Sequence, residues 1–337
     1  MRVPDKESAY TDIHVHAVPR DGKIRAHGWR RALFALAAKR SGAHGTGPEA
    51  ARTYTETLAR YLNSARHVRR AVLLALDQAY DEHGKPLTAM GGFSVSNEDV
   101  LAWCRDAPEV FLFGASIHPH RRDALDALEH CAEQGAVLVK WLPNSQGIDP
   151  ADRRNLPFYK KLAELGLPLL CHTGFEFALP AIHQAYGELE RLRLALEQGV
   201  TVIAAHSGSS GIFINRRALT RFEQMLRRYP NLYCDTAALA LPNRMEALLW
   251  WRGHPELFNR LLFATDFPVP LCALPWFLFL PRADYIRFAR EHNPFDRMAV
   301  LLKGLGVYPP PDGFELLLQQ LGRLSSSLCG TNTHPKQ

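Results

Sequence analysis

Short apolar segments alternate with helical patterns along most of the chain. Their hydrophobicity is nearly continuous, as in parallel strands that are buried on both faces. The later segments end at intervals of about thirty residues, the length of one strand plus its crossover helix. Eight such units predict a closed (β/α)8 barrel, the TIM barrel. The predicted strands are 10–17, 70–76, 110–117, 136–141, 167–172, 200–206, 231–236 and 261–266.

The alternative to a barrel is an open, doubly wound sheet. No Gly-x-Gly-x-x-Gly follows the first predicted strand, and such a motif would favour the open sheet. The chain of 337 residues is long enough for one barrel with insertions. We therefore predict a single barrel domain over residues 1–324 and a flexible tail over 325–337.

Helices are expected between the strands. A polar insertion, roughly 18–67, follows the first strand, and residues 80–97 read as a loop. Asn97 is a suitable N-cap for the helix that follows this loop. The apolar segment 271–280 is expected to line the barrel mouth or a subunit contact. The other predicted helices are 29–40, 49–66, 121–134, 155–165, 180–198, 215–228, 243–252, 281–291, 295–304 and 313–323.

Composition narrows the class of protein. The chain is 47% hydrophobic and 22% charged, which is typical of globular domains. No apolar run approaches the ~20 residues that span a membrane, and the polar start, Met1–Glu7, predicts no secretory signal. Six scattered cysteines without a Cys-x-x-Cys pair favour reduced thiols. We expect a cytoplasmic protein that contacts no membrane and can form a homo-oligomer.

The formal charge of +6 is a mild bias, and many of the basic residues lie in the first seventy positions. They can form solvated helix faces or a positive rim that attracts an anionic substrate. No zinc finger or RNP-type aromatic strand is present, so no nucleic-acid partner is expected. The expected partner is a small molecule.

The first predicted strand carries His14 and His16. Side chains alternate along a strand, so these two imidazoles share one face, while Ile13 and Val15 point to the other. Imidazole is a common ligand of zinc-like metals. Asp12 would lie on the same face, one layer deeper, and either bond to an imidazole or a buried lysine or serve the structure alone.

Later strands end in the same kind of chemistry. His172 ends the fifth strand, His206 the sixth and Asp266 the eighth, while Lys140 lies on the fourth. Functional residues of such barrels lie at the C-terminal ends of the strands. We therefore expect these side chains to converge with the two histidines of the first strand. A buried lysine is costly unless it is neutral or paired, which favours a functional role for Lys140.

Several segments together resemble the amidohydrolase superfamily, specifically its amidohydrolase-related (amidohydrolase-2-like) branch of metal-dependent hydrolases. That branch also includes lactonases and nonhydrolytic decarboxylases. The resemblance covers roughly residues 10–305, but the insertion 18–67 and the loop 271–280 have no counterpart. The matching segments are Asp12–His16, Val139–Pro143, Gly166–Gly174, Ala205–Gly208, Ala264–Pro268 and Asn293–Pro294.

The resemblance implies a ligand set for one divalent metal, most often zinc: His14, His16, His172 and Asp266. It also implies that Asp266 accepts a proton from a metal-activated water and later delivers it to the leaving group. His206 would contact the substrate or bind a second metal.

Two interpretations of Lys140 remain open. As a neutral amine it could carry a carbamate that bridges two metal ions, as strand-four lysines do in binuclear relatives. As a charged ammonium it could hold a substrate carboxylate. The branch often has one metal, which favours the second interpretation.

The leading hypothesis is a metal-dependent hydrolase in which a metal-activated water attacks the carbonyl of an amide, lactone or ester of a small, anionic or neutral molecule. The alternatives are a nonhydrolytic decarboxylase, a TatD-like phosphodiesterase and an inactive metal-binding barrel. The segment Gly114–His120 resembles TatD-type deoxyribonucleases, but their bridging glutamate is replaced here by Lys140. The residues expected to bind substrate are Trp141, Phe175 and His118, and the further candidates for the pocket wall are Asn144, Glu176, Arg244 and Trp276.

Overall fold

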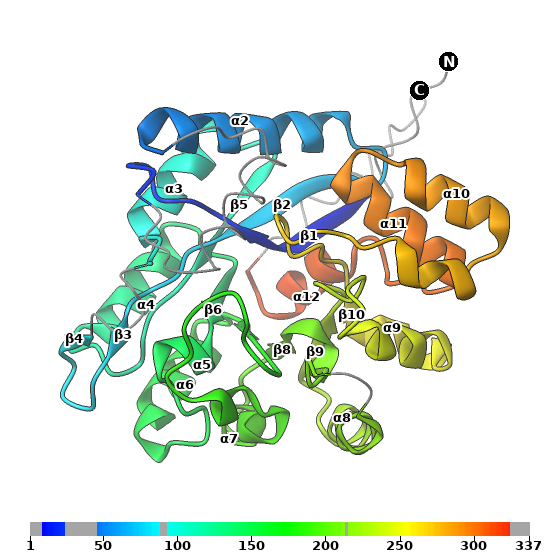
Figure 1. Cartoon of the computed structure of the whole chain (residues 1–337). Helices are drawn as coiled ribbons and strands as arrows, with labels where there is room; N and C mark the ends of the chain where they lie inside the picture. Colours follow the sequence, from blue (N-terminus) through cyan, green and yellow to red (C-terminus); the bar gives the residue numbers. More distant parts are fainter. Residues whose placement is uncertain (1–8, 24–45, 88–92, 213–214, 324–337) are drawn as a thin grey trace, which may run out of the picture.

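The computed structural model describes residues 9–23, 46–87, 93–212 and 215–323. Eight parallel strands form a nearly closed barrel in the order β1-β2-β5-β6-β7-β8-β9-β10, with helices outside it (Figure 1). This confirms the predicted TIM barrel. The strands are β1 (Tyr10–His16), β2 (Val68–Leu74), β5 (Phe111–Ala115), β6 (Leu138–Trp141), β7 (Leu169–Cys171), β8 (Val202–Ala204), β9 (Leu232–Asp235) and β10 (Leu261–Leu262).

The ring is completed between β1 and the chain that continues from β10. The Ile13 N–H donates to Phe263 O (3.2 Å), and the Asp266 N–H donates to His14 O (3.0 Å). Beyond them, the His16 N–H donates to Phe267 O (2.9 Å). The closure therefore holds the chain next to Asp266 against the His-x-His strand.

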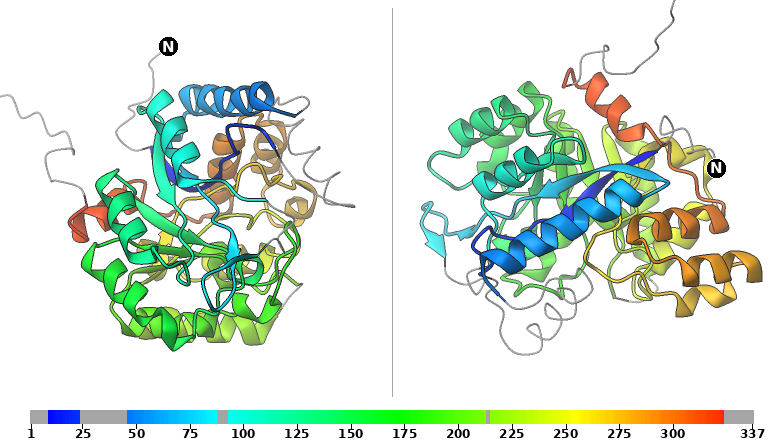
Figure 2. Two further views of the ribbon diagram at one scale, coloured as in Figure 1. Left: turned by 90° about the vertical axis from the view of Figure 1, so that its left-hand side faces the viewer. Right: turned by 90° about the horizontal axis from the view of Figure 1, so that it is seen from above.

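The helices follow the predicted pattern closely. Figure 2 shows α2 running alongside β1 and β2, so this helix covers the outside of the first two strands of the barrel. The helices are α2 (Pro48–Ser64), α3 (Asn97–Asp106), α4 (Ala124–Glu133), α5 (Pro143–Gln146), α6 (Leu156–Glu164), α7 (Arg193–Glu197), α8 (Arg216–Arg228), α9 (Met245–Arg252), α10 (Arg282–Arg290), α11 (Pro294–Leu305) and α12 (Gly313–Gln320). None of the helices in the described ranges is long and apolar enough to cross a membrane.

Short elements lie between these helices. Strands β3 (Ala79–Tyr80) and β4 (Pro86–Leu87) pair as an antiparallel hairpin within the predicted loop 80–97. The 3-10 helices are η3 (Arg153–Asn155), η4 (Gln184–Gly187), η5 (Leu189–Leu192), η6 (Ala205–Gly208), η7 (Pro255–Arg260) and η8 (Leu274–Leu278). The predicted helix 29–40 and tail 325–337 lie outside the described residues.

The single helix expected over 180–198 is wrong, because the structure breaks it into η4, η5 and α7. Gly187 ends η4 at a place where two loops touch: a Cβ there would lie 2.3 Å from Gly174 O. The N-cap of α3 also differs from the prediction. Ser96 accepts the Asp99 N–H, while the Asn97 amide bonds to both backbone groups of Ser116.

A register shift in β1 changes which side chains face the interior. Asp12 pairs with Ala71 and Val15 pairs with Leu73, so three steps along β1 match two along β2. The extra residue is a β-bulge, which interrupts simple alternation.

The expected orientation of two residues is therefore wrong. Ile13 packs inside the barrel rather than beside Val15, which lies in the outer core. Asp12 leaves the inward face and accepts hydrogen bonds from Thr265 N (3.1 Å) and Thr265 Oγ1 (2.6 Å). Among the described residues, Asp12 bonds to no imidazole or lysine side chain; its remaining partner is the backbone N–H of His14, on its own strand. The role of Asp12 in the described structure is thus to join β1 to the segment after β10.

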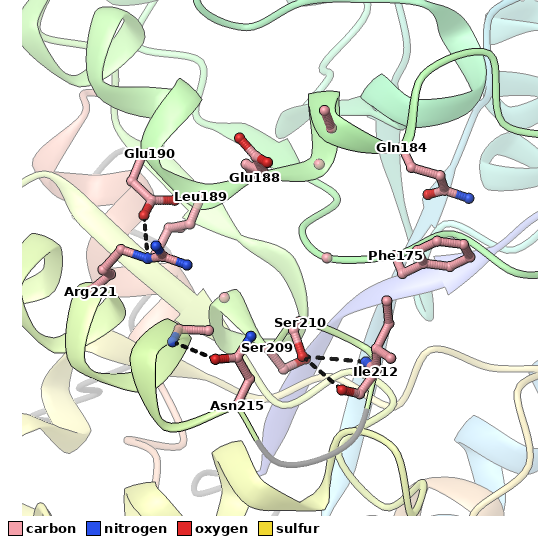
Figure 3. Close-up of a pocket in the computed structure, with 15 residues that line it drawn as sticks. Phe175, Gln184, Glu188, Leu189, Glu190, Ser209, Ser210, Ile212, Asn215 and Arg221 are labelled. Atoms are coloured by element: carbon pink, nitrogen blue, oxygen red, sulfur yellow. Dashed lines mark hydrogen bonds and ion pairs between the residues drawn. The ribbon is translucent and has the colours of Figure 1, made fainter.

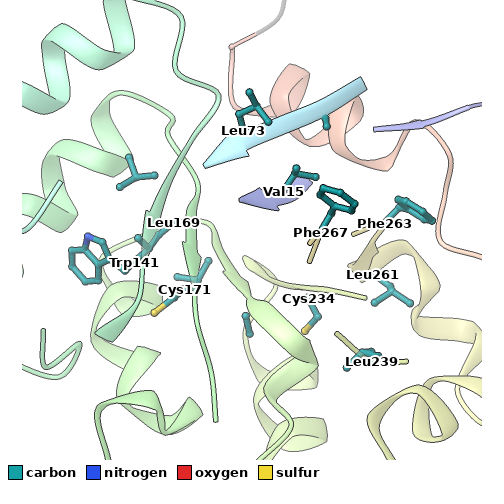
Figure 4. Packing of buried hydrophobic residues seen from close by; sticks show 14 of the residues in the cluster. Val15, Leu73, Trp141, Leu169, Cys171, Cys234, Leu239, Leu261, Phe263 and Phe267 are labelled. Carbon is teal, nitrogen blue, oxygen red and sulfur yellow. The ribbon is translucent and has the colours of Figure 1, made fainter. Parts of the chain in front are cut away.

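Two layers of apolar side chains hold the barrel. The larger layer packs the outside of the strands against the helices, and Figure 4 shows part of it around Val15, Trp141 and Phe267. The smaller layer fills the barrel interior, where Phe314, Leu317 and Leu318 of α12 are buried with strand residues. Because α12 and apolar residues fill one end of the interior, polar side chains gather at the opposite end, where the strands finish.

Candidate metal centre

Three potential metal ligands meet at the C-terminal ends of the strands. His14 and His16 come from β1, and Asp266 follows β10; one donor atom from each lies within 4.8 Å of the others. The His16 Nε2 lies 2.9 Å from Asp266 Oδ1, and the His14 Nε2 lies 3.3 Å from the same oxygen. His14 is buried, whereas the His16 side chain is 45% exposed. This end of the site is therefore open to a small molecule.

Asp235, at the end of β9, fixes how His14 presents its nitrogens. Its Oδ2 lies 2.9 Å from the His14 Nδ1, so we assign the imidazole proton to Nδ1. The His14 Nε2 then carries a lone pair directed at the cluster. Metal-binding histidines commonly donate their other N–H to a carboxylate in this way. The same lone pair now faces Lys140 Nζ at 3.0 Å.

His172 and His206 form a second group beside the cluster. The His206 Nδ1 lies 3.0 Å from Ala237 O, so it donates a proton there. The His206 Nε2 then accepts from the His172 Nδ1 at 3.0 Å. This order leaves the His172 Nε2 as an unprotonated nitrogen that is buried without a hydrogen-bond partner. Within the described residues, His172 thus lies outside the three-residue cluster, but the lone pair of its Nε2 is free to bind a metal ion.

Backbone strain is concentrated at this end of the barrel. Among the residues that the structure describes, four other than glycine have positive φ: His206 (61°), Ser207 (52°), Ala238 (57°) and Asp266 (66°). Such conformations cost free energy and occur preferentially at functional sites. Asp235 holds one of the strained turns, because its Oδ1 accepts the backbone N–H of His206 at 2.7 Å. The local sequence around these residues does not predict this conformation.

Burial and neighbouring charges set the protonation of the site. Burial lowers the pKa of His14, His172 and His206 well below the usual value, so all three imidazoles are neutral and can act as ligands. Burial also lowers the pKa of Lys140. Burial opposes ionisation of Asp266, but the electrostatic influence of the neighbouring His14, His16 and Lys140 and the hydrogen bond from His16 outweigh burial and lower the pKa of Asp266. Asp266 is therefore a carboxylate.

Asp235 and Glu176 are two further acids of the site. Burial raises the pKa of Asp235 to about 6. Burial also raises the pKa of Glu176, whose Oε2 lies 3.5 Å from the His172 Nε2. From the sequence, Glu176 is only a candidate for the pocket wall, and Asp235 is not among the predicted site residues. The signal for Asp235 was its position at the end of a strand, where His206 and Asp266 had been recognised.

Arg244 joins the loops that follow β7 and β8. Its guanidinium is buried and donates to Thr173 O (3.2 Å), Ser209 Oγ (2.8 Å) and Phe175 O (3.2 Å). All of these acceptors are neutral, and no ion pair links Arg244 to an acid among the described residues. The positive charge therefore remains available to an anion in the site.

Two expected substrate-binding residues have other roles. Trp141 is fully buried against Phe158 and Tyr159, and its Nε1 donates to Ile117 O (2.8 Å). It follows Lys140 on β6, so when Lys140 points into the barrel Trp141 must point outward. The prediction that Trp141 contacts substrate is wrong.

His118 is also unsuited to bind substrate directly, because both ring nitrogens are engaged. The Nδ1 accepts the His120 N–H (3.1 Å), and the Nε2 donates to Gln146 O (3.1 Å). Of the three expected substrate-binding residues, Phe175 alone lines a cavity, beside the loop after β8.

The buried His118 predicts a pH-dependent stability. Burial lowers its pKa from the usual 6.5 to about 3, so below pH 6.5 the unfolded chain takes up a proton that the folded chain does not. The free energy of unfolding should therefore fall by about 1.4 kcal/mol per pH unit below pH 6.5 from this group. Urea unfolding of the wild type and His118→Gln at pH 6.5 and 5.0 checks this. The free energy of unfolding of the wild type minus that of the variant should fall by about 2 kcal/mol when the pH is lowered from 6.5 to 5.0. A difference that stays the same at both pH values would contradict the prediction.

Comparison with known proteins identifies the family. A sequence model of the enzyme family described as "Amidohydrolase" matches residues 11–287, most of the chain. Members of this family are typically metal-dependent enzymes, and the cluster of His14, His16 and Asp266 could hold a metal ion. The chain belongs to the amidohydrolase family. Among curated proteins no match is found.

Solved structures show the same fold. An uncharacterised TIM-barrel protein from Bordetella bronchiseptica is 21% identical and has a TM-score of 0.57, over 93% of this chain and 99% of that one. The 4-oxalomesaconate hydratase from Rhodopseudomonas palustris is 15% identical with a TM-score of 0.56, over 95% and 97%. A candidate 2-pyrone-4,6-dicarboxylic acid hydrolase from Pseudomonas putida is 14% identical with a TM-score of 0.55, over 97% and 100%. At these identities the likeness shows the fold.

Proposed function

We propose that this chain is a metal-dependent hydrolase that cleaves the carbonyl C–O or C–N bond of a small ester, lactone or amide. The observation that carries the proposal is the state of the Asp266 carboxylate. Its Oδ1 is held by His16, while no described residue donates a hydrogen bond to its Oδ2. Hydrolysis consumes a water molecule whose proton needs an acceptor, and an ionised carboxylate with an unengaged oxygen supplies one.

The donor set suits a zinc-like ion. His14, His16 and Asp266 would hold it, joined by His172 through its unpartnered Nε2. Neutral imidazoles plus one carboxylate are the ligands typical of catalytic zinc sites. When bound, such an ion lowers the pKa of water to about 7 and polarises a substrate carbonyl. The proposal is for one ion per chain.

The chain's own residues would divide the remaining work. Asp266 accepts the proton of the attacking water and returns it to the leaving group. His206 lies beside the cluster, and its two hydrogen bonds, from Nδ1 to Ala237 O and from His172 Nδ1 to its Nε2, keep the imidazole proton on Nδ1. Lys140 and Arg244 supply positive charge at a buried site where no described acid forms an ion pair with either, which favours an anionic substrate.

Metal removal tests this function. Dialysis against a chelator should abolish turnover of a panel of esters, lactones and amides, and one equivalent of zinc should restore it. Metal analysis should then find one ion per chain and mass spectrometry an unmodified Lys140. Two ions with a carbamate on Lys140 would replace the single-metal proposal by a binuclear one.

The reaction type needs a second measurement. In water labelled with oxygen-18, the carboxylic acid product of a hydrolase gains the label. Release of CO2 without label in the product would overturn hydrolysis and assign a decarboxylase on the same scaffold. The variant His118→Gln is the control for loss of a histidine outside the metal site and should behave like the wild type in these assays. His118 is buried, and both of its ring nitrogens are hydrogen-bonded to groups outside the cluster.

A further inference from the structure

The carboxylate of Glu176 is buried next to His172 but is anchored through only one of its oxygens. Its Oε1 accepts the backbone N–H groups of Ala178 (2.5 Å) and Leu179 (2.8 Å). Its Oε2 lies 3.5 Å from the His172 Nε2, and no described residue donates a hydrogen bond to it. Glu176 thus presents one carboxylate oxygen, in a fixed orientation, to the imidazole that would bind the metal ion.

The backbone of Glu176 is held by a different residue. The Gln184 side chain accepts the Glu176 N–H (3.0 Å) and donates to Glu176 O (2.8 Å). Phe175 and Gln184 line a separate cavity of about 360 Å³, which none of the potential metal ligands lines (Figure 3). Glu176 does not line that cavity either, so its side chain points away from it and toward His172.

The gap between the Glu176 Oε2 and the His172 Nε2 lies between two acceptors. The hydrogen bonds through His206 leave the His172 Nε2 unprotonated. The separation of 3.5 Å also exceeds the roughly 2.7–3.2 Å of a hydrogen bond, so no proton joins the two atoms. A buried acceptor without a donor costs free energy, and native proteins rarely leave one unpaired. We therefore expect a bound molecule to supply the donor to Oε2.

The surroundings favour a neutral donor over a cation. The proposed metal ion already has four protein ligands, as is typical of zinc, and Glu176 is not in the group of described residues whose donor atoms lie within 4.8 Å of one another. The positive charges of Lys140 and Arg244 already act on the Glu176 carboxylate. A cationic group of a substrate would be repelled by both of these charges. A neutral N–H or O–H group meets neither obstacle.

We propose that Glu176 is a specificity-determining residue whose Oε2 accepts a hydrogen bond from an N–H or O–H group within two bonds of the substrate carbonyl carbon. The position of that carbonyl beside His172 rests on the proposed function. An amide nitrogen that carries a hydrogen meets this requirement, whereas the bridging oxygen of an ester or lactone has no hydrogen to donate. A site built to bind such a donor discriminates against the analogue that lacks it, because the buried acceptor then stays unpaired.

Glu176→Gln tests the proposal, because it exchanges the free acceptor for a donor and keeps the anchor. The glutamine oxygen can still accept the Ala178 and Leu179 N–H groups, which places its NH2 where Oε2 lies. Glu246→Gln is the matched control, since Glu246 on α9 is also buried and accepts a backbone N–H, that of Asn215. Urea unfolding and metal analysis check that both variants keep the fold and the ion.

The probes are acetohydroxamic acid and its N-methyl analogue, which bind zinc through the same two oxygens but differ in the N–H next to the carbonyl carbon. In calorimetric titrations of the zinc-loaded full chain, the wild type and Glu246→Gln should bind the first at least tenfold more tightly, and Glu176→Gln should lose this preference. Equal affinity for both probes in the wild type, or an unchanged preference in Glu176→Gln, would overturn the proposal. Weakened zinc binding in Glu176→Gln would assign Glu176 to the metal ion and overturn it as well.

A second measurement connects Glu176 to turnover. For a secondary amide and its N-methylated form, Glu176→Gln should lower the ratio of their kcat/KM values at least tenfold. An unchanged ratio would overturn a role in substrate selection. Failure of the proposed function is distinguishable, because neither amide would then be turned over while the hydroxamates still report on Glu176.

Discussion

Replacing Asp266 by asparagine is expected to lower kcat/KM by roughly 10²–10⁴-fold, the range for a lost general base. The Asp266 carboxylate is the proton acceptor of the proposed reaction, and an amide cannot take that role. The backbone should keep its conformation, because asparagine tolerates the positive φ of 66° found at this position. Steady-state kinetics with saturating zinc and the metal content of the purified variant are the measurements.

The control for this substitution is Asp296→Asn. Asp296 is equally buried but lies on α11, where it accepts the backbone N–H groups of Arg66 and His67. This variant should lose stability and keep its kcat/KM. Turnover within a factor of about three of the wild type in Asp266→Asn, with metal bound, would contradict the assignment of Asp266 as the base.

Replacing Asp235 by asparagine is expected to weaken zinc binding roughly 10–100-fold, the usual effect of losing a partner of a metal ligand. The asparagine oxygen can still accept the His206 and Ala237 N–H groups, which bond to Asp235 Oδ1 (2.7 and 3.1 Å). Its NH2 then faces the His14 Nδ1. The imidazole must accept there, so its proton moves to Nε2 and blocks the nitrogen that would bind the metal.

Zinc affinity is measured by competition with a chelator, and stability by urea unfolding. Asp235→Ala is the companion variant, since it removes all three acceptor contacts and should also lower the free energy of unfolding by about 1–3 kcal/mol. A purely structural role for Asp235 would show as lost stability with unchanged zinc affinity in both variants. The comparison therefore separates orientation of His14 from support of the fold.

The positions of the elements follow from local pattern. All eight strands and nearly all helices within the described residues lie where hydrophobic continuity and helical spacing predict them. The helix expected over 180–198 fails because Gly187 serves a contact with Gly174, thirteen residues earlier in the chain. A pattern of neighbouring residues holds no information about that contact.

Position at a strand end sufficed to predict most side chains of the site, whereas the orientation of a side chain depends on contacts between strands. His14, His16, His172, His206, Lys140 and Asp266 all lie at strand ends, and the parallel barrel brings such ends together. Trp141 was misplaced although alternation with Lys140 already excludes it from the interior. Asp12 could not be placed, because the bulge in β1 depends on pairing with β2.

The sequence by itself determined that this chain forms a barrel with imidazoles and a carboxylate at its strand ends, because apolar periodicity and chain order suffice for that. The tertiary structure decided which of those groups touch. Asp235 orients His14, His172 bonds to His206 rather than joining the three-residue cluster, and Arg244 ties together the loops that follow β7 and β8. These contacts join residues 30 or more positions apart, and they depend on strand register and loop packing, which arise only when the ring of strands closes.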